Sequence, residues 1–261
     1  MNKKLISVLL SLVLVCSCAL ALAEITVTKR DMALNRNLDK NVSNILVLMQ
    51  DGDKTDTMMI ASVNSRTGRS VMTQIACDTV VNVPEVGDVA LGEVYMLGDA
   101  KSRGLLAART VNGLLDLNIS TYVALDLQKL PELVNQVGKL NMWLNDEEAE
   151  ILGTWAGDNS LSGEDVLRYV RIRLESDYAE KNRSYMVFMD LLKQGLRSTS
   201  GANLMGLGKK LLSSMDTNLN ALAAVTMLGS FQAGDDRREL ALLSTMPSEE
   251  MRAAFHREVY E

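Results

Sequence analysis

The sequence predicts a single α/β domain in which helices flank a mixed central β-sheet. Continuous apolar runs at 44–49 and 57–64 are typical of buried strands, and amphipathic helical segments follow them along the chain. No Pro/Gly/Ser-rich linker and no internal repeat divides the 261 residues. We expect the domain to span 43–247, with a leader arm at 24–42 and a C-terminal tail at 248–261.

The first 23 residues have the composition of a signal peptide. "MNKK" is basic, "LISVLLSLVLV" is apolar but shorter than the roughly 20 residues of a membrane span, and "ALA" is a small-residue cleavage site. The alternatives are an uncleaved N-terminal anchor and lipid attachment at Cys18, for which "VCSC" is a poor match. Each interpretation places the chain outside the cytoplasm, in the cell envelope: secreted, lipid-anchored or membrane-anchored.

Four strands are predicted, and their order favours a mixed sheet. They lie at 44–49, 57–64, 71–76 and 120–127. An acidic turn joins the first two, and a Gly-containing turn joins the second and third into a hairpin. The fourth strand follows a helical segment, so its partner must come from earlier in the chain.

Six segments have helical spacing. They are 100–115, 130–138, 161–170, 182–196, 207–215 and 219–231. Gly138 is expected to end the second of these helices. Ser162, with Asp165 three residues later, forms a variant capping box that is expected to begin the third.

The composition argues against several classes of function. A net charge of −6 disfavours nonspecific nucleic-acid binding. His256 is the only histidine and is expected on the surface, so the usual zinc sites and a Ser-His-Asp triad are disfavoured. Cys77 is the only cysteine after the first 23 residues, and with no visible partner base it is predicted to be a small buried thiol rather than a nucleophile. No Gly-rich nucleotide-binding motif is present.

Two polar clusters are candidate binding residues. The turn "QDGDKTDT" carries Asp51, Asp53 and Asp56, whose oxygens suit Mg²⁺, although Asp and Gly are also ordinary turn residues. Arg171 and Arg173 follow the 161–170 helix, and an extended backbone would point both guanidiniums at one anion. The alternative for this pair is an ordinary helix C-terminus, where basic residues are favoured by the dipole.

Three long segments together are more specific than any single motif. They are "NILVLM…TDTMMIASVNSRTGRSVMTQIACDTVVNVP", "RTVNGLLDLNISTYVALDLQKLPELVNQVG" and "LSGEDVLRYVRIRLESDYAEKNRSYMVFMDLLKQ". In order and spacing this chain resembles the LytR-CpsA-Psr family of cell-wall glycopolymer ligases over residues 43–247. The resemblance implies an apolar polyprenyl pocket beside the sheet. It also implies Mg²⁺-dependent transfer of a glycopolymer from a polyprenyl-diphosphate carrier to a peptidoglycan hydroxyl.

The resemblance assigns roles residue by residue. The family's "S-D-T" matches 55–57, so Asp56 would bind Mg²⁺ together with Asp51 or Asp53. The family's "R-x-R" is intact as Arg171 and Arg173, which would hold the diphosphate. Of "D-x-G-R-x-x-R-Q", two residues remain and would support the site: Asp177 and Arg183.

The same comparison shows where this chain departs from the family pattern. Cys77 stands where "P-R-D-T" has its Arg, and Glu180 and Ser184 replace an Arg and the Gln of the last motif. "K-L-N-H-A-Y" becomes "ALGEVY", which removes the Lys and Asn and adds Glu93. Each lost charge-assisted contact weakens anion binding by about 1.5–3 kcal/mol. We therefore expect either weak transfer or a non-catalytic protein that binds polyprenyl phosphate or regulates a paralogue.

Overall fold

The computed structural model describes residues 24–174, 183–197, 213–220, 223 and 237–261. The predicted helices at 207–215 and 219–231 fall largely outside these ranges, as do Asp177 and Glu180. Within the described ranges, no helix is both long and apolar enough to cross a membrane.

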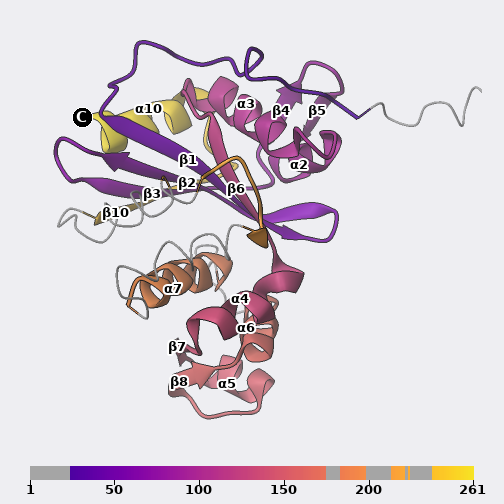
Figure 1. The fold of residues 1–261 in the computed structure, drawn as a ribbon, viewed down its shortest axis with the longest axis vertical. Coiled ribbons are helices and arrows are strands. Elements are labelled where there is room, and N and C mark those ends of the chain that lie inside the picture. Colours follow the sequence, from indigo (N-terminus) through magenta and orange to yellow (C-terminus); the bar gives the residue numbers. More distant parts are fainter. Residues whose placement is uncertain (1–23, 175–182, 198–212, 221–222, 224–236) are drawn as a thin grey trace, which may run out of the picture.

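A six-stranded mixed sheet forms the centre of the molecule (Figure 1). Its strands run in the order β10-β3-β2-β1-β6-β9. They are β1 (Val42–Asp51), β2 (Lys54–Asn64), β3 (Ser70–Ile75), β6 (Thr121–Asp126), β9 (Asp216–Thr217) and β10 (Arg237–Leu242). Strand β2 lies between β1 and β3 and is antiparallel to both, whereas β6 pairs parallel with β1 and β10 pairs parallel with β3. The predicted mixed sheet, including the β2–β3 hairpin, is confirmed.

The central strands are apolar on both faces because both faces are covered. In β1, Leu46 and Leu48 belong to one hydrophobic cluster, while Ile45, Val47 and Met49 belong to the other. This alternation across a strand explains the continuous apolar run in the sequence. Each cluster is the core of one layer, so the sheet separates two hydrophobic cores.

The first layer consists of helices that lie above the sheet in Figure 1. It contains α2 (Val94–Leu97), α3 (Arg103–Leu115) and α10 (Ser248–Tyr260), together with the small hairpin of β4 (Val80–Val83) and β5 (Gly87–Ala90) and the 3₁₀ turn Leu91–Glu93. Gly104 in α3 is required for close approach to the sheet, because a Cβ there would lie 2.1 Å from the ring of Tyr122.

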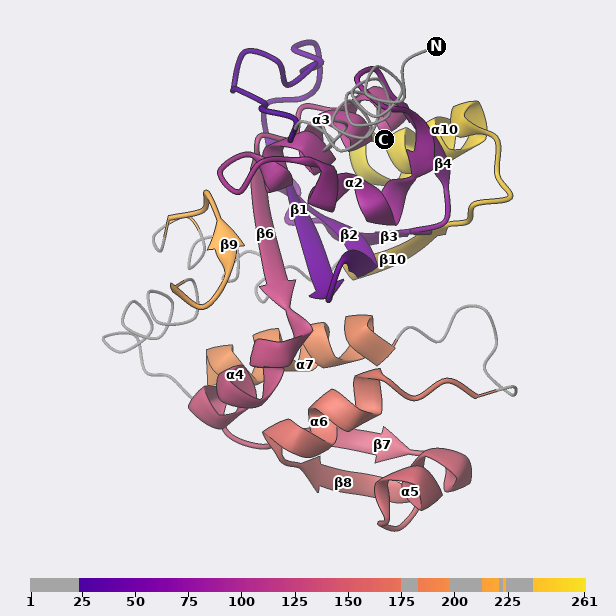
Figure 2. The same cartoon turned by 90° about the vertical axis from the view of Figure 1, so that its right-hand side faces the viewer.

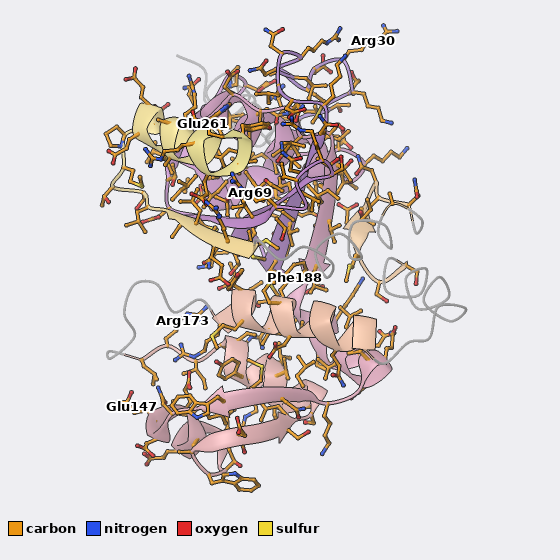
Figure 3. The ribbon with its side chains drawn as sticks, turned by 90° about the vertical axis from the view of Figure 1, so that its left-hand side faces the viewer. Arg30, Arg69, Glu147, Arg173, Phe188 and Glu261 are labelled. Carbon is orange, nitrogen blue, oxygen red and sulfur yellow. The ribbon has the colours of Figure 1, made fainter. Side chains whose placement is uncertain are left out.

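The second layer lies on the opposite face and carries its own hairpin (Figure 2). It contains the 3₁₀ turn Leu127–Lys129, α4 (Leu130–Val137), β7 (Leu140–Leu144), α5 (Asp146–Leu152), β8 (Gly157–Leu161), α6 (Gly163–Val170) and α7 (Arg183–Arg197). Figure 3 shows Phe188 of α7 at the side of that helix that faces the sheet, and its side chain is buried in the second core.

Local signals set the ends of the helices in this second layer. Ser162 caps α6 and accepts a hydrogen bond from the Asp165 N–H, as predicted, and Gly138 follows α4 with a φ of +98°. At Gly163, a Cβ would lie 2.4 Å from the carbonyl oxygen of Pro131, so only glycine allows α4 and α6 to approach this closely.

The structure corrects the predicted arm at 24–42. Ile25, Val27 and Met32 are buried in the first core, and the Ile25 N–H donates to the Leu97 carbonyl at 2.9 Å. These isolated apolar residues show no period, which is why the sequence suggested a polar connection. The segment is nevertheless part of the domain because its side chains complete the core under α2 and α3.

The predicted C-terminal tail is also wrong. Residues 248–260 form α10, which buries Met251, Ala254, Phe255 and Val259 in the first core. His256, expected on the surface, is half-buried and lies 2.8 Å from the Leu115 carbonyl through Nε2. The spacing of the four buried residues is helical, and this amphipathic pattern was available in the sequence.

Replacing Phe255 tests the contribution of α10 to the core. We expect Phe255→Ala to lower the free energy of unfolding by about 3–5 kcal/mol, because it leaves a cavity where a ring was fully buried. Arg257→Ala, on the exposed side of the same helix, should change it by less than about 0.5 kcal/mol. Urea denaturation followed by circular dichroism measures both, and a Phe255→Ala variant as stable as wild type would contradict this role.

Candidate functional site

Asp56 is displaced from the regular ladder between β1 and β2. Met49 pairs with Thr57 and Gln50 pairs with Thr55, so Asp56 is the extra residue of a β-bulge. A bulge bends its strand and redirects one side chain. Here it directs a largely buried carboxylate, with 17% of its side chain exposed, toward the second layer at the end of β1.

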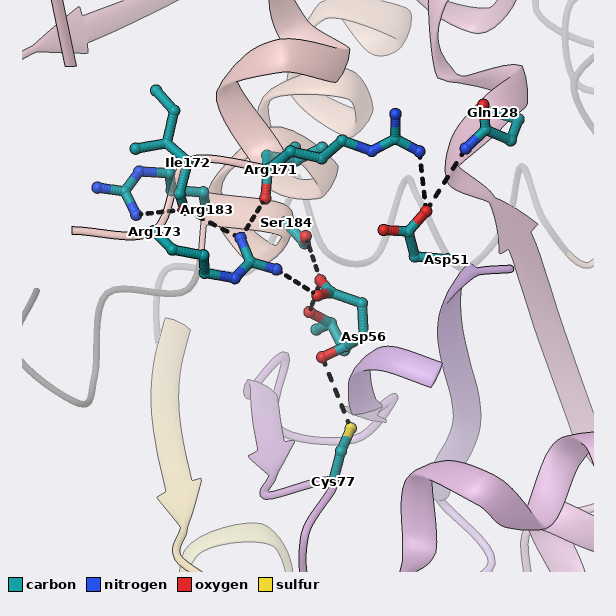
Figure 4. Close-up of polar contacts among 11 residues, drawn as sticks. Asp51, Asp56, Cys77, Gln128, Arg171, Ile172, Arg173, Arg183 and Ser184 are labelled. Atoms are coloured by element: carbon teal, nitrogen blue, oxygen red, sulfur yellow. Dashed lines mark hydrogen bonds and ion pairs between the residues drawn. The ribbon is translucent and has the colours of Figure 1, made fainter. Parts of the chain in front are cut away.

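The Asp56 carboxylate accepts hydrogen bonds from the second layer and from its own strand (Figure 4). Arg173 Nη2 donates to Oδ1 at 2.8 Å, and Ser184 Oγ donates to Oδ2 at 2.7 Å. Thr57 Oγ1, the next residue along β2, donates to the same Oδ2 at 3.1 Å. Asp56 therefore connects the sheet to the end of α6 and the start of α7.

Asp51, the last residue of β1, makes the matching contact with Arg171. Arg171 Nη2 lies 2.9 Å from Asp51 Oδ1, which also accepts from Gln128 Nε2 at 3.5 Å. The two predicted arginines thus reach the same edge of the sheet and contact two different carboxylates. Arg171 is also the C-cap of α6, as expected for a basic residue at a helix C-terminus. Its guanidinium nevertheless contacts the Asp51 carboxylate.

Arg173 is ordered by the end of the helix it follows. Its Nη1 donates to the Val170 carbonyl at 2.8 Å and to the Ile172 carbonyl at 2.9 Å, which leaves Nη2 for Asp56. The side chain is 64% exposed, so one side of the guanidinium faces solvent. A guanidinium that is oriented by backbone and open to solvent is well placed to bind an anion.

Arg183 lies in the interior, unlike Arg171 and Arg173. Its Nε contacts Glu148 Oε1 at 2.9 Å, in an ion pair whose side chains are 3% and 0% exposed, and its Nη1 donates to the Ile172 carbonyl at 3.1 Å. The guanidinium also lies 5.8 Å from the centre of the Tyr169 ring. Arg183 therefore orders the segment that carries the two surface arginines.

Sequence reasoning missed Glu148 and the contact of Ser184 with Asp56. The motif Asn145-x-x-Glu148 is visible as a capping box at the start of α5, and the structure confirms both of its hydrogen bonds. Arg183, the ion-pair partner of Glu148, is 35 residues further along the chain. Nothing local in the sequence indicated that pairing.

The predicted metal ligands are only partly brought together. Asp51 and Asp56 lie at the same sheet edge, while Asp53 is exposed in the β1–β2 turn beside Gly52, whose φ is +68°. Among the residues that the structure describes, no group of three or more His, Cys, Asp or Glu side chains is arranged to hold a metal. Two carboxylates nevertheless suit Mg²⁺, which commonly binds one or two of them together with substrate phosphates.

Cys77 lies directly beneath Asp56, and its thiol donates to the Asp56 carbonyl at 3.7 Å. Burial and the nearby Asp56 carboxylate raise the pKa of the thiol to about 12, which keeps it protonated. A small buried thiol was predicted, and Cys77 is half-buried against the first core. A Cβ added to Gly92 would lie 3.0 Å from the Cβ of Cys77, so these two positions are adjacent in space.

Comparison with known proteins identifies the family of this chain. The LytR_cpsA_psr family model matches residues 17–253, and the chain therefore belongs to the LytR-CpsA-Psr family. A relative from Enterococcus faecalis strain V583, named polyisoprenyl-teichoic acid–peptidoglycan teichoic acid transferase TagU, is 29% identical over 202 residues, which are 72% of this chain and 64% of the relative. The chain thus spans less than two thirds of that relative's length.

Solved structures of TagT are similar in fold. The structure described as TagT bound to LIIa-WTA has a TM-score of 0.68 and 18% identity, and the match covers 87% of this chain and 95% of that one. The structure of YwtF (TagT) with bound octaprenyl pyrophosphate lipid has a TM-score of 0.66 and 17% identity, with 92% and 98% covered. The predicted single α/β domain of this family is confirmed.

Proposed function

We propose that this protein binds a polyprenyl-diphosphate-linked glycopolymer and transfers the glycopolymer to a peptidoglycan hydroxyl. The observation that carries this proposal is the paired charge at the sheet edge, where Arg171 and Arg173 face Asp51 and Asp56. The arginines supply planar donor groups for the diphosphate. The names of the relatives and the lipid in one structural neighbour support this choice of ligand.

The two ion pairs are suited to exchange with a ligand. Each has a partly exposed arginine, and exposed ion pairs contribute only about 0–1 kcal/mol. A diphosphate can therefore replace Asp51 as the partner of Arg171 at little cost, whereas Asp56, which is 17% exposed, would keep its hydrogen bonds from Ser184 and Thr57 when Arg173 turns to the diphosphate. Asp51 and Asp56 would then be the residues that hold Mg²⁺, which would neutralise charge on the diphosphate.

Charge neutralisation and positioning account for most of the catalysis in phosphoryl transfer. The attacking sugar hydroxyl forms a bond to phosphorus and releases its proton to solvent, while the bond to the bridging diphosphate oxygen breaks, so that the polyprenyl phosphate leaves with the electron pair. Arg171 and Arg173 are placed to stabilise the charge on that leaving group. The polyprenyl chain itself requires an apolar surface, for which we propose the second core beneath α7, lined by residues such as Phe188.

The substrate and the acceptor place this reaction at the outer face of the membrane. We propose that residues 1–23 direct export, either as a cleaved signal peptide, as an anchor or through lipid attachment at Cys18. A membrane-proximal position would bring Arg171 and Arg173 within reach of a lipid-linked diphosphate. Peptidoglycan, the acceptor, lies on the same side.

A second candidate function is lipid binding without transfer. Cys77 favours it, because a protonated thiol stands where the family has a diphosphate-binding Arg, and Gly92 beside it replaces the family's Asn. Such a protein would capture carrier lipid or regulate an active paralogue. The two candidate functions share the same binding surface and differ in chemistry.

Replacing both surface arginines tests the binding surface. We expect polyprenyl diphosphate to raise the Tm of the wild type, and Arg171→Ala with Arg173→Ala to weaken binding on the order of 100-fold, since two charge-assisted contacts are lost. Arg168→Ala is the matched control, because Arg168 donates to the Ile151 and Leu152 carbonyls. Isothermal titration calorimetry gives the affinities. Equal binding by the double variant and the control would exclude this surface.

Asp56→Asn tests the proposed Mg²⁺ ligand, because its effect on lipid affinity should differ with and without the metal. In the wild type, added Mg²⁺ should tighten binding of polyprenyl diphosphate, and the Asn variant should lose this effect. In buffer with chelator, the variant should bind at least as tightly as wild type, because Arg173 loses its carboxylate partner. Asp158→Asn, exposed on β8, is the control. A wild-type affinity that does not respond to Mg²⁺ would remove the metal from the proposal.

Cys77→Arg separates the two candidate functions. If the wild type is a slow transferase, a purified assay of glycopolymer transfer to peptidoglycan should show turnover that Cys77→Arg increases at least about tenfold, because an additional arginine contact returns to the diphosphate. Cys77→Met introduces a long side chain without the positive charge of Arg, and so controls for the added volume. Wild-type lipid binding without transfer would support the non-catalytic alternative.

A further inference from the structure

Glu148 is a fully buried carboxylate whose two oxygens have separate partners. Oε2 accepts the Asn145 N–H at 3.0 Å, and this contact completes the cap of α5. Oε1 accepts Arg183 Nε at 2.9 Å. With both oxygens engaged and no exposed surface, the orientation of the carboxylate is fixed by α5.

Arg183 links Glu148 to the segment that contains Arg171 and Arg173. Its Nη1 donates to the carbonyl of Ile172, at 3.1 Å, and Ile172 lies between Arg171 and Arg173. Arg173 donates to the same carbonyl at 2.9 Å. Figure 4 shows Arg183 and Ile172 next to Arg173 and the Asp56 contact. Three successive contacts therefore link α5 to the anion-binding side chains.

The charge of Glu148 is required for this arrangement. Removing the charge of one partner from a buried ion pair is strongly unfavourable, so a neutral Glu148 would weaken the contact that orients Arg183. The Ile172 carbonyl would then lose one of its two donors. Because residues 172–174 follow α6 without regular secondary structure, side-chain contacts such as this one determine where the backbone of the segment lies.

We propose that Glu148 is a positioning residue for diphosphate binding, acting through Arg183 on the Arg171–Arg173 segment. The proposal rests on the proposed function of that segment. It assigns a role in ligand binding to a side chain that no ligand can reach. It also predicts that the effect of Glu148 is specific to the charged end of the lipid.

Comparison of a charged and a neutral lipid tests this role. Polyprenyl diphosphate and the corresponding polyprenol share the apolar chain, and only the first engages the arginines. We expect Glu148→Gln to weaken binding of the diphosphate about tenfold or more and to leave binding of the polyprenol unchanged. Glu150→Gln makes the same chemical change at an exposed position of α5 and should bind both lipids as the wild type does.

The outcomes separate this inference from the proposed function. If the wild type binds both lipids equally and Arg171→Ala with Arg173→Ala has no effect, the proposed function itself is wrong. If the double variant loses diphosphate selectivity while Glu148→Gln retains it, only the positioning role is overturned. Equal weakening of both lipids by Glu148→Gln would show a general structural defect and would also overturn the proposal.

A second variant keeps the test valid if Glu148→Gln does not fold. Arg183→Lys retains a positive charge beside Glu148 but replaces the planar guanidinium that spans Glu148 and the Ile172 carbonyl. We expect this variant to fold and to lose diphosphate affinity selectively, as Glu148→Gln does. Wild-type affinity for the diphosphate in Arg183→Lys would overturn the proposed connection.

Discussion

The burial of β1 and β2 on both faces is the constraint on which the candidate site depends. Because apolar side chains alternate between two cores, each face must be covered by its own layer, and polar groups are confined to the ends of these strands. Asp51 terminates β1, and the bulge at Asp56 turns a carboxylate toward the second layer. The same burial that stabilises the sheet thus places two acids opposite the end of α6.

Three arginine–carboxylate pairs in this region differ in exposure, and exposure decides what each can do. The pairs of Arg171 with Asp51 and of Arg173 with Asp56 are partly open to solvent, where such pairs are weak and a ligand can replace one partner. The pair of Arg183 with Glu148 is closed, and removing either partner would leave a buried charge. The open pairs are therefore suited to binding, and the closed pair to positioning.

Local patterns predicted much of the fold but not the contacts that complete the site. The β2–β3 hairpin and the Ser162 cap depend on neighbouring residues, and both were predicted. The helix α10 was not predicted, because its few apolar residues lie among many charged ones and the segment resembles a polar tail. The Glu148–Arg183 pair depends on how α5 packs near α7, and local sequence carries no signal for it.

Two of the positions at which the sequence predicts a departure from the family pattern lie together in space. Cys77 and Gly92 are 15 positions apart, yet the Gly92 N–H donates to the Cys77 carbonyl at 2.8 Å and a Cβ at 92 would meet that of Cys77. Cys77 and Gly92 thus form one site, on the side of Asp56 that faces the first layer. Arg171 and Arg173 approach from the second layer, with a segment ordered by Arg183. A diphosphate between the layers would therefore keep its partners on one side and lose them on the other, so that binding depends more heavily on the segment after α6.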